Sequence, residues 1–205
     1  LNDNTLHQTV YLIDFCVNTD GNSFSPQNYQ LLGITALFVS CKFEEIYFPK
    51  MMDFIKITDK SVTKQEMLEM EFLIMKLIDY RFYTCYKLRF LEIYRYIFEM
   101  DLNEFLFCKY CLETVFMEEG FNDYHNSVVT LSVIFSYLKI SSRNTRRQKE
   151  INSKVFILLN NRIEEFKDCI VKMVKHLDAL IKPNASDIFK FRYEEECEKM
   201  KVNRK

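Results

Sequence analysis

The residues in this chain that could do chemistry are few, and their spacing is not that of a catalytic set. Cys108 and Cys111 have the spacing of a zinc-binding CxxC pair, but the sequence contains no second CxxC or HxxxH pair to supply the other ligands. Two cysteines three residues apart share one face of a helix, which explains their spacing without a metal ion. The histidines His7, His125 and His176 belong to no HExxH pattern. We therefore expect no catalytic residue, no metal site and no cofactor.

Two opposite charges, Lys42 and Glu71, are placed where they could serve as donor and acceptor for a partner protein. Lys42 lies near the C-terminal end of a helix predicted over residues 27–44, where the helix dipole favours a cation. Glu71 lies in the first half of a helix predicted over residues 63–80. If these helices pack together, both charges sit on rigid elements. The alternative is an ordinary solvated helix end formed by Lys42, Glu44 and Glu45.

The helix over residues 27–44 is the element around which the others are expected to pack. From Leu31 to Cys41 it has no polar face, and a helix that is apolar all round is buried on all sides. Ser25 is a candidate N-cap, with Pro26 in the first helical position. The run is too short to span a bilayer, which needs about 20 apolar residues.

Composition favours an all-α fold. The chain has 205 residues, of which 48% are hydrophobic and 28% charged, and only 3 Gly and 3 Pro, which favours long helices with short joints. The formal net charge of −1 provides no basic field to attract nucleic acid or anionic lipid. The seven scattered cysteines fit reduced thiols, and no signal peptide or transmembrane run is present. We expect a protein of the nucleus and cytoplasm, with no membrane or nucleic-acid partner.

Apolar periodicity predicts two series of helices. The first series covers residues 4–18, 27–44, 49–57 and 63–80; Pro49 opens the third of these helices, and Thr63 with Glu66 forms a capping box for the fourth. The second series has five helices. They cover residues 87–100, 101–118, 123 or 126 to 140, 153–160 and 163–181, and Asp101 with Glu104 can cap the second of them. Residues 141–149 are predicted to form a solvated basic loop. If one helix is missing at the start of the first series, the two series have the same succession of helices.

The chain closely resembles the cyclin box of the A/B, or mitotic, cyclins. The motifs that carry the resemblance are SCKFEEIYFP at 40–49, FIKITD at 54–59, Thr63 and the pair Met70-Glu71. The resemblance is dense from Leu6 to Phe82 and continues more thinly over essentially the whole chain. It implies two tandem cyclin-box helical bundles of about five helices each, with the first helix of the first box absent upstream of Leu1. The expected domains are an N-terminal box at 1–83, a C-terminal box at 84–182 and a helical tail at 183–205.

In that family the first box binds a cyclin-dependent kinase and has no catalytic residue of its own. The resemblance implies that Lys42 and Glu71, 29 residues apart as in the family, contact the kinase. The apolar kinase contacts would fall on Val39, Phe43, Met75 and Phe82. The protein would be a non-catalytic regulatory subunit that forms a heterodimer with the kinase, activates it and controls cell-cycle progression at G2/M.

Gln30 matches the glutamine of a docking groove through which cyclins bind kinase substrates or inhibitors. Most of that groove lies on the first helix of the box, so Gln30 is expected to be a remnant that cannot form a groove by itself. The chain also departs from the family at Phe48, where cyclins usually have proline.

Three other functions compete with this interpretation. A transcription-related protein with a cyclin fold would bind nucleic acid or the transcription machinery, and for DNA it would need a basic face. A degenerate cyclin would bind a kinase without activating it. An enzyme would need a nucleophile pair, a phosphate loop or a metal motif, and the sequence contains none of these.

Overall fold

The scarcity of glycine and proline permits long uninterrupted helices, and the molecule is built from them. The computed structural model describes residues 1–82, 85–141 and 145–180, and within these ranges it contains nine α-helices, two short 3-10 helices and no strand. The predicted all-α class is therefore confirmed. No helix in these ranges is long and apolar enough to cross a bilayer.

The chain divides into two compact units, Leu1–Tyr86 and Lys87–Lys205. The boundary lies close to the predicted division after residue 83, and the predicted tail at 183–205 lies outside the described residues. The first unit contains α1 (Asp3–Thr19), η1 (Gly21–Ser23), α2 (Tyr29–Glu44), α3 (Met51–Ile57) and α4 (Lys64–Leu77). The second contains α5 (Lys87–Ile97), α6 (Leu102–Val115), η2 (Glu119–Phe121), α7 (Asn126–Ser141), α8 (Thr145–Leu159) and α9 (Ile163–Leu180).

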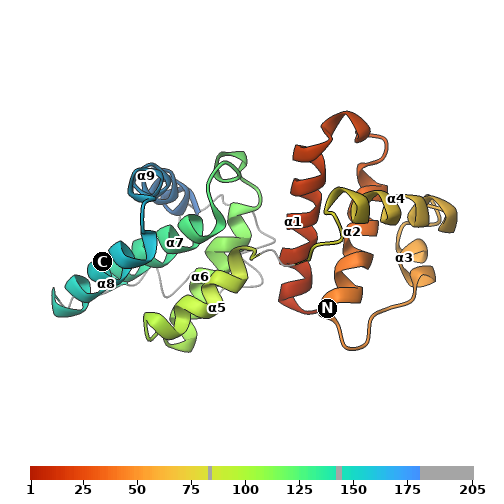
Figure 1. Ribbon diagram of the computed structural model, residues 1–205. Helices are drawn as coiled ribbons and strands as arrows, with labels where there is room; N and C mark the ends of the chain where they lie inside the picture. Colours follow the sequence, from red (N-terminus) through yellow and green to blue (C-terminus); the bar gives the residue numbers. More distant parts are fainter. Residues whose placement is uncertain (83–84, 142–144, 181–205) are drawn as a thin grey trace. The chain divides into compact units, whose positions relative to one another are not determined.

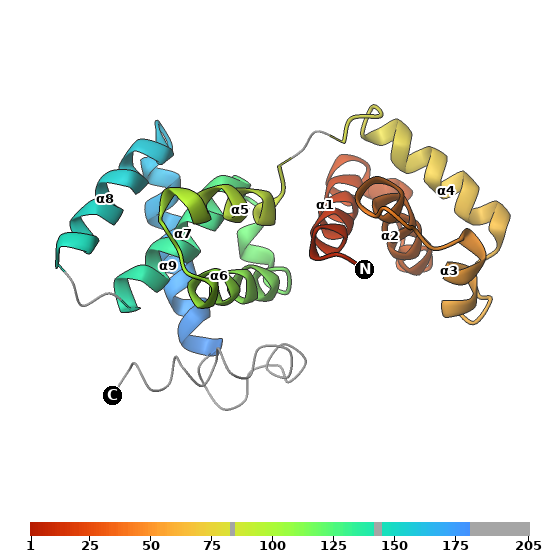
Figure 2. The same ribbon diagram turned by 90° about the horizontal axis from the view of Figure 1, so that it is seen from below.

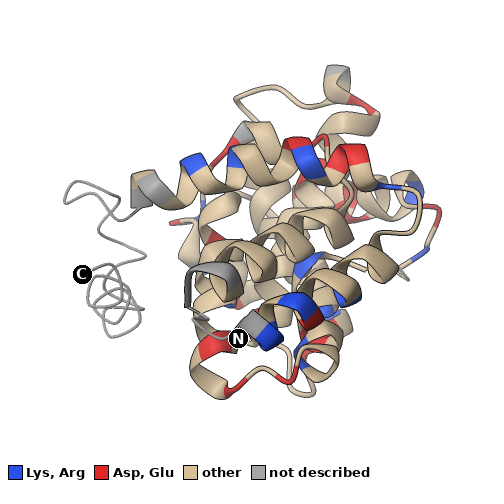
Figure 3. Ribbon diagram, turned by 90° about the vertical axis from the view of Figure 1, so that its left-hand side faces the viewer, with Lys and Arg blue, Asp and Glu red and all other residues tan. Residues whose placement is uncertain are grey.

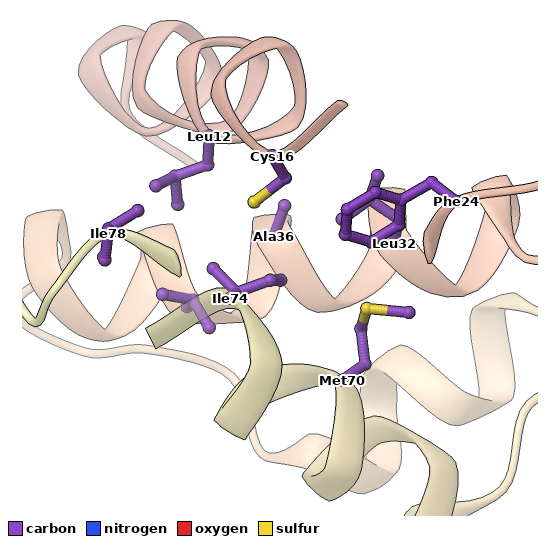
Figure 4. Packing of buried hydrophobic residues seen from close by; sticks show 9 residues of the cluster. Leu12, Cys16, Phe24, Leu32, Ala36, Met70, Ile74 and Ile78 are labelled. Atoms are coloured by element: carbon purple, nitrogen blue, oxygen red, sulfur yellow. The ribbon is translucent and has the colours of Figure 1, made fainter. Parts of the chain in front are cut away.

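Helix α2 is the central element of the first unit. It lies between α1 on one side and the α3–α4 pair on the other, and it contacts all three (Figures 1 and 2). None of its residues from 31 to 41 is exposed, as its apolar sequence predicts. The side chains that meet in this core come from α1, α2, α4 and the segment before α2 (Figure 4): Leu12, Cys16, Phe24, Leu32, Ala36, Met70, Ile74 and Ile78.

Helix α7 has the same position in the second unit. It contacts the other four α-helices of that unit (Figure 1). Its core side chains are at most 1% exposed: Val128, Val129, Leu131, Val133, Ile134 and Leu138. Each unit is therefore organised around one apolar helix.

Local capping residues start two of the helices as predicted. The hydroxyl of Thr63 accepts a hydrogen bond from the amide of Glu66 at 3.3 Å, and the carboxylate of Glu66 accepts one from the amide of Thr63 at 2.7 Å. Asp101 and Glu104 form the same reciprocal pair at 2.8 and 3.0 Å. Each capping box satisfies two backbone N–H groups that have no partner within the helix, so both predictions are confirmed.

The predicted start of α2 is wrong. The helix begins at Tyr29, and Ser25 is not its N-cap. The reason is local, because the side-chain oxygen of Asn28 accepts a hydrogen bond from the amide of Ser25 at 2.9 Å, while the amide of Asn28 donates to the carbonyl of Ser25 at 3.0 Å. These bonds close a turn over residues 25–28 before the helix starts.

Helix α3 also starts later than predicted. It begins at Met51 rather than at Pro49, because Lys50 occupies the N-cap position. The carboxylate of Asp53 accepts a hydrogen bond from the amide of Lys50 at 3.2 Å. This contact satisfies a backbone donor just before the first turn.

Helices α4 and α5 each end three residues earlier than the predicted ranges 63–80 and 87–100. Asp79 and Tyr80 after α4, and Glu99 after α5, have left-handed φ values of 51°, 55° and 50°. A residue in this region stops the helix, a role that glycine usually fills. With so few glycines in the chain, other residues fill it here.

The prediction of a solvated loop over residues 141–149 is wrong for residues 145–149, because α8 already begins at Thr145. The guanidinium of Arg147 donates to both carboxylate oxygens of Glu104 on α6, at 2.9 and 3.0 Å. Further along α8, Ile151 and Val155 are each 3% exposed, so the helix has an apolar face against the core. Contacts with residues distant in sequence thus support a helix whose first turn is strongly polar.

Candidate functional site

Lys42 and Glu71 lie side by side on two packed helices. Lys42 is in the last turn of α2, Glu71 is in the middle of α4, and the ammonium of Lys42 donates a hydrogen bond to the carboxylate of Glu71. Their side chains are 34% and 20% exposed. The ammonium also lies 4.4 Å from the centre of the Phe38 ring, in a cation–π arrangement. The two charges are therefore held in place but still accessible from solvent.

This ion pair retains hydrogen-bonding capacity for a partner. An ammonium has three donors and a carboxylate has two acceptor oxygens, so one mutual bond leaves each group able to make others. An ion pair that is partly exposed contributes only about 0–1 kcal/mol to stability. The pair therefore provides a fixed donor and acceptor at little expected gain in folding free energy.

Apolar side chains surround the pair. The rings of Phe43 and Phe82 stack with centroids 4.7 Å apart and planes inclined by 17°. Phe43 is 51% exposed, while Met75 and Phe82 are partly buried and pack against the core of the unit. Val39 is only 2% exposed, so it lies in the core beneath this surface rather than on it. The structure thus brings the predicted residues together, with Val39 as a supporting residue.

Further exposed apolar residues lie on or just after the same helices and were not predicted to contact a partner. Ile46 and Tyr47, in the segment after α2, are 89% and 92% exposed, and Phe48 beside them is half exposed. Phe72 follows Glu71 on α4, and Tyr80 follows the end of that helix; both are exposed. The signal in the sequence was a hydrophobic run continuing beyond the end of α2. Apolar side chains that gather at an exposed surface are typical of a protein–protein contact.

Glu44 and Glu45, the two acidic residues after Phe43, are not free surface charges. The carboxylate of Glu45 accepts hydrogen bonds from the hydroxyl of Thr5 at 2.6 Å and from the amide of Asn2 at 2.5 Å. These contacts, led by the Thr5 hydroxyl, hold the pKa of Glu45 below its usual value. The carboxylate of Glu44 accepts a hydrogen bond from the phenol of Tyr86 at 2.9 Å. The interpretation of this helix end as merely solvated is wrong for both residues.

Gln30 lies apart from these residues, in the first turn of α2. The twelve residues that separate it from Lys42 correspond to about 18 Å along a helix. Its side chain is exposed, and its amide oxygen accepts a hydrogen bond from the hydroxyl of Ser61 at 3.3 Å. The predicted remnant of a docking groove is thus a separate location from the Lys42–Glu71 pair.

The cysteines of the CxxC pair are both buried on α6. Burial raises the pKa of the Cys108 thiol well above its usual value, which disfavours the thiolate that a metal or a nucleophilic reaction would need. Within the described ranges, no three His, Cys, Asp or Glu residues are grouped so that they could hold a metal ion.

Comparisons with known proteins identify the family. Residues 1–83 match the family model described as "Cyclin, N-terminal domain". Cyclin-A2-4 of Arabidopsis thaliana is 35% identical over 136 residues, covering 64% of this chain and 29% of that protein. G2/mitotic-specific cyclin-B of Spisula solidissima is 33% identical over 137 residues (66% and 31%), and G2/mitotic-specific cyclin-B2 of Anguilla japonica is 31% identical over 130 residues (63% and 32%).

These matches extend beyond the N-terminal domain. They cover more residues than the 83 of the family model, so they continue into the second unit, and they span about a third of the length of each relative. These matches lead to one conclusion: residues 1–83 of this chain are an N-terminal domain of the cyclin family.

Proposed function

We propose that this chain binds and activates a cyclin-dependent protein kinase and thereby controls cell-cycle progression at G2/M. Cyclins are typically non-catalytic regulators of kinases, and the relatives named above include G2/mitotic-specific cyclins. A regulator of this kind acts as a heterodimer with its kinase, in the nucleus and cytoplasm. We also propose that the second unit is the C-terminal cyclin box, over residues 84–182. Its helices α5, α6, α8 and α9 pack around the apolar helix α7, just as α1, α3 and α4 of the first unit pack around α2.

The observation that carries the proposal is the Lys42–Glu71 pair beside the stacked Phe43 and Phe82 rings. A partner that covers the two rings would exclude water from the neighbouring charges, and hydrogen bonds to those charges would then gain strength. Because α2 and α4 are packed against each other, little side-chain freedom remains to be lost on binding. The arrangement suits a backbone segment that offers both carbonyl and amide groups to the pair.

Activation follows from binding one conformation of the kinase better than another. Protein kinases need a paired Lys and Glu and an ordered activation segment before they can transfer phosphate. A cyclin can shift a kinase only by its differential affinity for the active and inactive states. Moving the equilibrium from 1:99 to 99:1 takes about 5.5 kcal/mol of differential binding. A broad apolar contact with a central polar pair is a reasonable source for that energy.

The experiment mixes the purified chain with the cell-cycle kinase of the same organism and measures histone phosphorylation and the Kd of the complex. We expect the wild type to activate the kinase. Lys42→Ala and Glu71→Ala should each weaken binding by about 2–5 kcal/mol, the range for truncating one member of a buried charged contact.

The matched control is Lys56→Ala, which removes an exposed lysine of α3 that pairs with Asp53 at 3.5 Å. This variant should bind the kinase like the wild type. If both site variants bind the kinase as well as the control does, the kinase contacts a different surface of the protein. A folded wild type that fails to activate the kinase would refute the proposal.

No observation on the described residues favours the nucleic-acid alternative. Lysine and arginine are interspersed with aspartate and glutamate along the helices (Figure 3), and the formal net charge is −1. DNA-binding proteins concentrate positive charge on one face to hold phosphates. We therefore carry one proposed function forward.

A further inference from the structure

Tyr86, the last residue of the first unit, is buried against the end of α2. Its side chain is only 3% exposed, and its ring stacks on that of His7 with centroids 6.1 Å apart. The phenol oxygen lies 2.9 Å from a carboxylate oxygen of Glu44 and 3.1 Å from the side-chain oxygen of Asn4. A phenol carries one hydrogen, and the carboxylate is the stronger acceptor. The bond to Glu44 is therefore the stronger of these two phenol contacts.

Three contacts hold the last turn of α2. Cys41 is fully buried in the core, Glu44 accepts from Tyr86, and Glu45 accepts from the first turn of α1. Lys42 and Phe43 lie between these anchored positions. Helix ends otherwise fray, because their last carbonyl groups have no partner within the helix. The anchors thus fix the part of the helix that carries both the charge and the aromatic ring of the candidate site.

We propose that Tyr86 is a positioning residue for this surface: through Glu44, its hydroxyl holds the last turn of α2 in the arrangement that a kinase binds. The inference rests on the proposed function, which supplies the kinase. A residue that is only 3% exposed offers a partner almost no surface, so any effect of Tyr86 on affinity is indirect, and Glu44 is the contact that links it to the last turn of α2. The bond joins residues 42 positions apart, and it therefore ties the exit of the chain from the first unit to the motif that contains Lys42.

The test compares Tyr86→Phe, which removes only the hydroxyl, with the wild type of the full chain. We measure the Kd for the cell-cycle kinase and amide hydrogen exchange over residues 42–45. Losing a hydrogen bond to a charged acceptor should weaken kinase binding by up to about 10- to 150-fold, with faster exchange in this turn and unchanged exchange at Ile74 in the core. The control is Tyr94→Phe, a buried tyrosine of the second unit, which should change neither measurement.

Two variants of Glu44 separate positioning from general stability. Glu44→Gln keeps an acceptor oxygen for the phenol and should retain most of the affinity, whereas Glu44→Ala should lose it. Because Tyr86 and Glu44 act as one unit, Tyr86→Phe combined with Glu44→Ala should bind no more weakly than Glu44→Ala alone. Additive losses in the double variant would overturn the coupling.

The outcomes also separate this inference from the proposed function. If Tyr86→Phe lowers the unfolding midpoint but leaves exchange at residues 42–45 and kinase affinity unchanged, Tyr86 has no positioning role. If the wild type binds no kinase, the proposed function fails. Faster exchange at 42–45 in Tyr86→Phe would then still establish the anchor, and unchanged exchange would refute it as well.

Discussion

The two units share one architectural principle but differ in what the polar side chains near the ends of their central helices do. In the first unit, ion pairs and hydrogen bonds gather at the C-terminal end of α2, around Lys42 and Glu44. In the second, a set of polar contacts lies near the N-terminal end of α7, where the phenol of Tyr124 donates to Asp168 and the amide of His125 donates to Glu165. The first set lies beside exposed aromatic rings, whereas the second fastens α9 to the loop before α7.

This difference indicates how two similar helical cores can have different roles. The central helices α2 and α7 each contain 16 residues, and between their ends they carry only apolar side chains and small hydroxyl groups. Burying such a helix stabilises a unit but offers nothing to a partner. The capacity to bind depends on the side chains that leave the core at the helix ends. In the first unit these form the candidate kinase surface, and in the second they mainly satisfy one another.

The largest expected effect tests whether the two cores are independent. Ile74→Ala in the first unit and Ile134→Ala in the second each remove a side chain with 0% exposure, and each should cost about 2–5 kcal/mol. Segment-resolved hydrogen exchange should show that Ile74→Ala lowers protection in α1, α2 and α4 but spares α7 and α9. Equal loss of protection in both units from either variant would show that they unfold as one.

A smaller effect is expected where the second unit depends on a polar contact between helices. Glu104 is 7% exposed, and Arg147 supplies two hydrogen bonds to its carboxylate, so Arg147→Ala should cost about 1–3 kcal/mol. Chemical denaturation measures this difference. Lys149→Ala, an exposed position on the same helix, is the control and should stay within about 0.5 kcal/mol of the wild type. If Lys149→Ala lowers the free energy of unfolding as much as Arg147→Ala does, the effect comes from the charge on the helix and not from the contact with Glu104.

Acid should weaken the second unit as the pH falls below about 7. Burial lowers the pKa of His125 and His176 in the folded state, and Arg162 lowers that of His125 further. Below the ordinary histidine pKa of about 6.5, these histidines bind protons in the unfolded chain but stay neutral in the folded chain. Protonation therefore favours the unfolded state, and the free energy of unfolding decreases as the pH falls from about 7 towards 5.

In the first unit, hydrogen bonds lower the pKa of Glu45 and Glu66. Stability from these carboxylates is present above their ordinary pKa and is lost only as the pH falls below about 4.5. Hydrogen exchange as a function of pH should show α9 losing protection between pH 7 and 5. His176→Gln, which keeps a polar group beside Thr114 and Glu118, should reduce the loss between pH 7 and 5. Unchanged protection of α9 between pH 7 and 5 would contradict the prediction.

The smallest effect on stability should come from the candidate site itself. The double variant with Lys42→Glu and Glu71→Lys exchanges the two charges and preserves an ion pair between α2 and α4. The free energy of unfolding should therefore change by no more than about 0.5–1 kcal/mol. Kinase binding should nevertheless be lost, because the donor and acceptor are interchanged. Retained binding in the exchanged variant would mean that the pair is only a contact between helices, like Arg147 with Glu104.

The sequence alone determined the features that depend on neighbouring residues. The capping boxes of Thr63 with Glu66 and Asp101 with Glu104 form within a single turn, so they could be predicted from spacing. The burial of α2 followed from its lack of a polar face. The motif around Lys42 and Glu71 led to the cyclin family, because several short segments at fixed spacing are more specific than any one helix.

The tertiary structure decided which distant side chains meet. Periodicity could not place the start of α8 at Thr145, because that turn is supported by Arg147 reaching Glu104, 43 residues away. The same holds for Glu44, whose partner Tyr86 is 42 residues away, and for Val39, which the packing of α4 covers. Capping and periodicity act within a few residues, whereas these contacts exist only once the helices have packed. The residues proposed to bind a kinase were therefore visible in the sequence, but the residues that hold them in position were not.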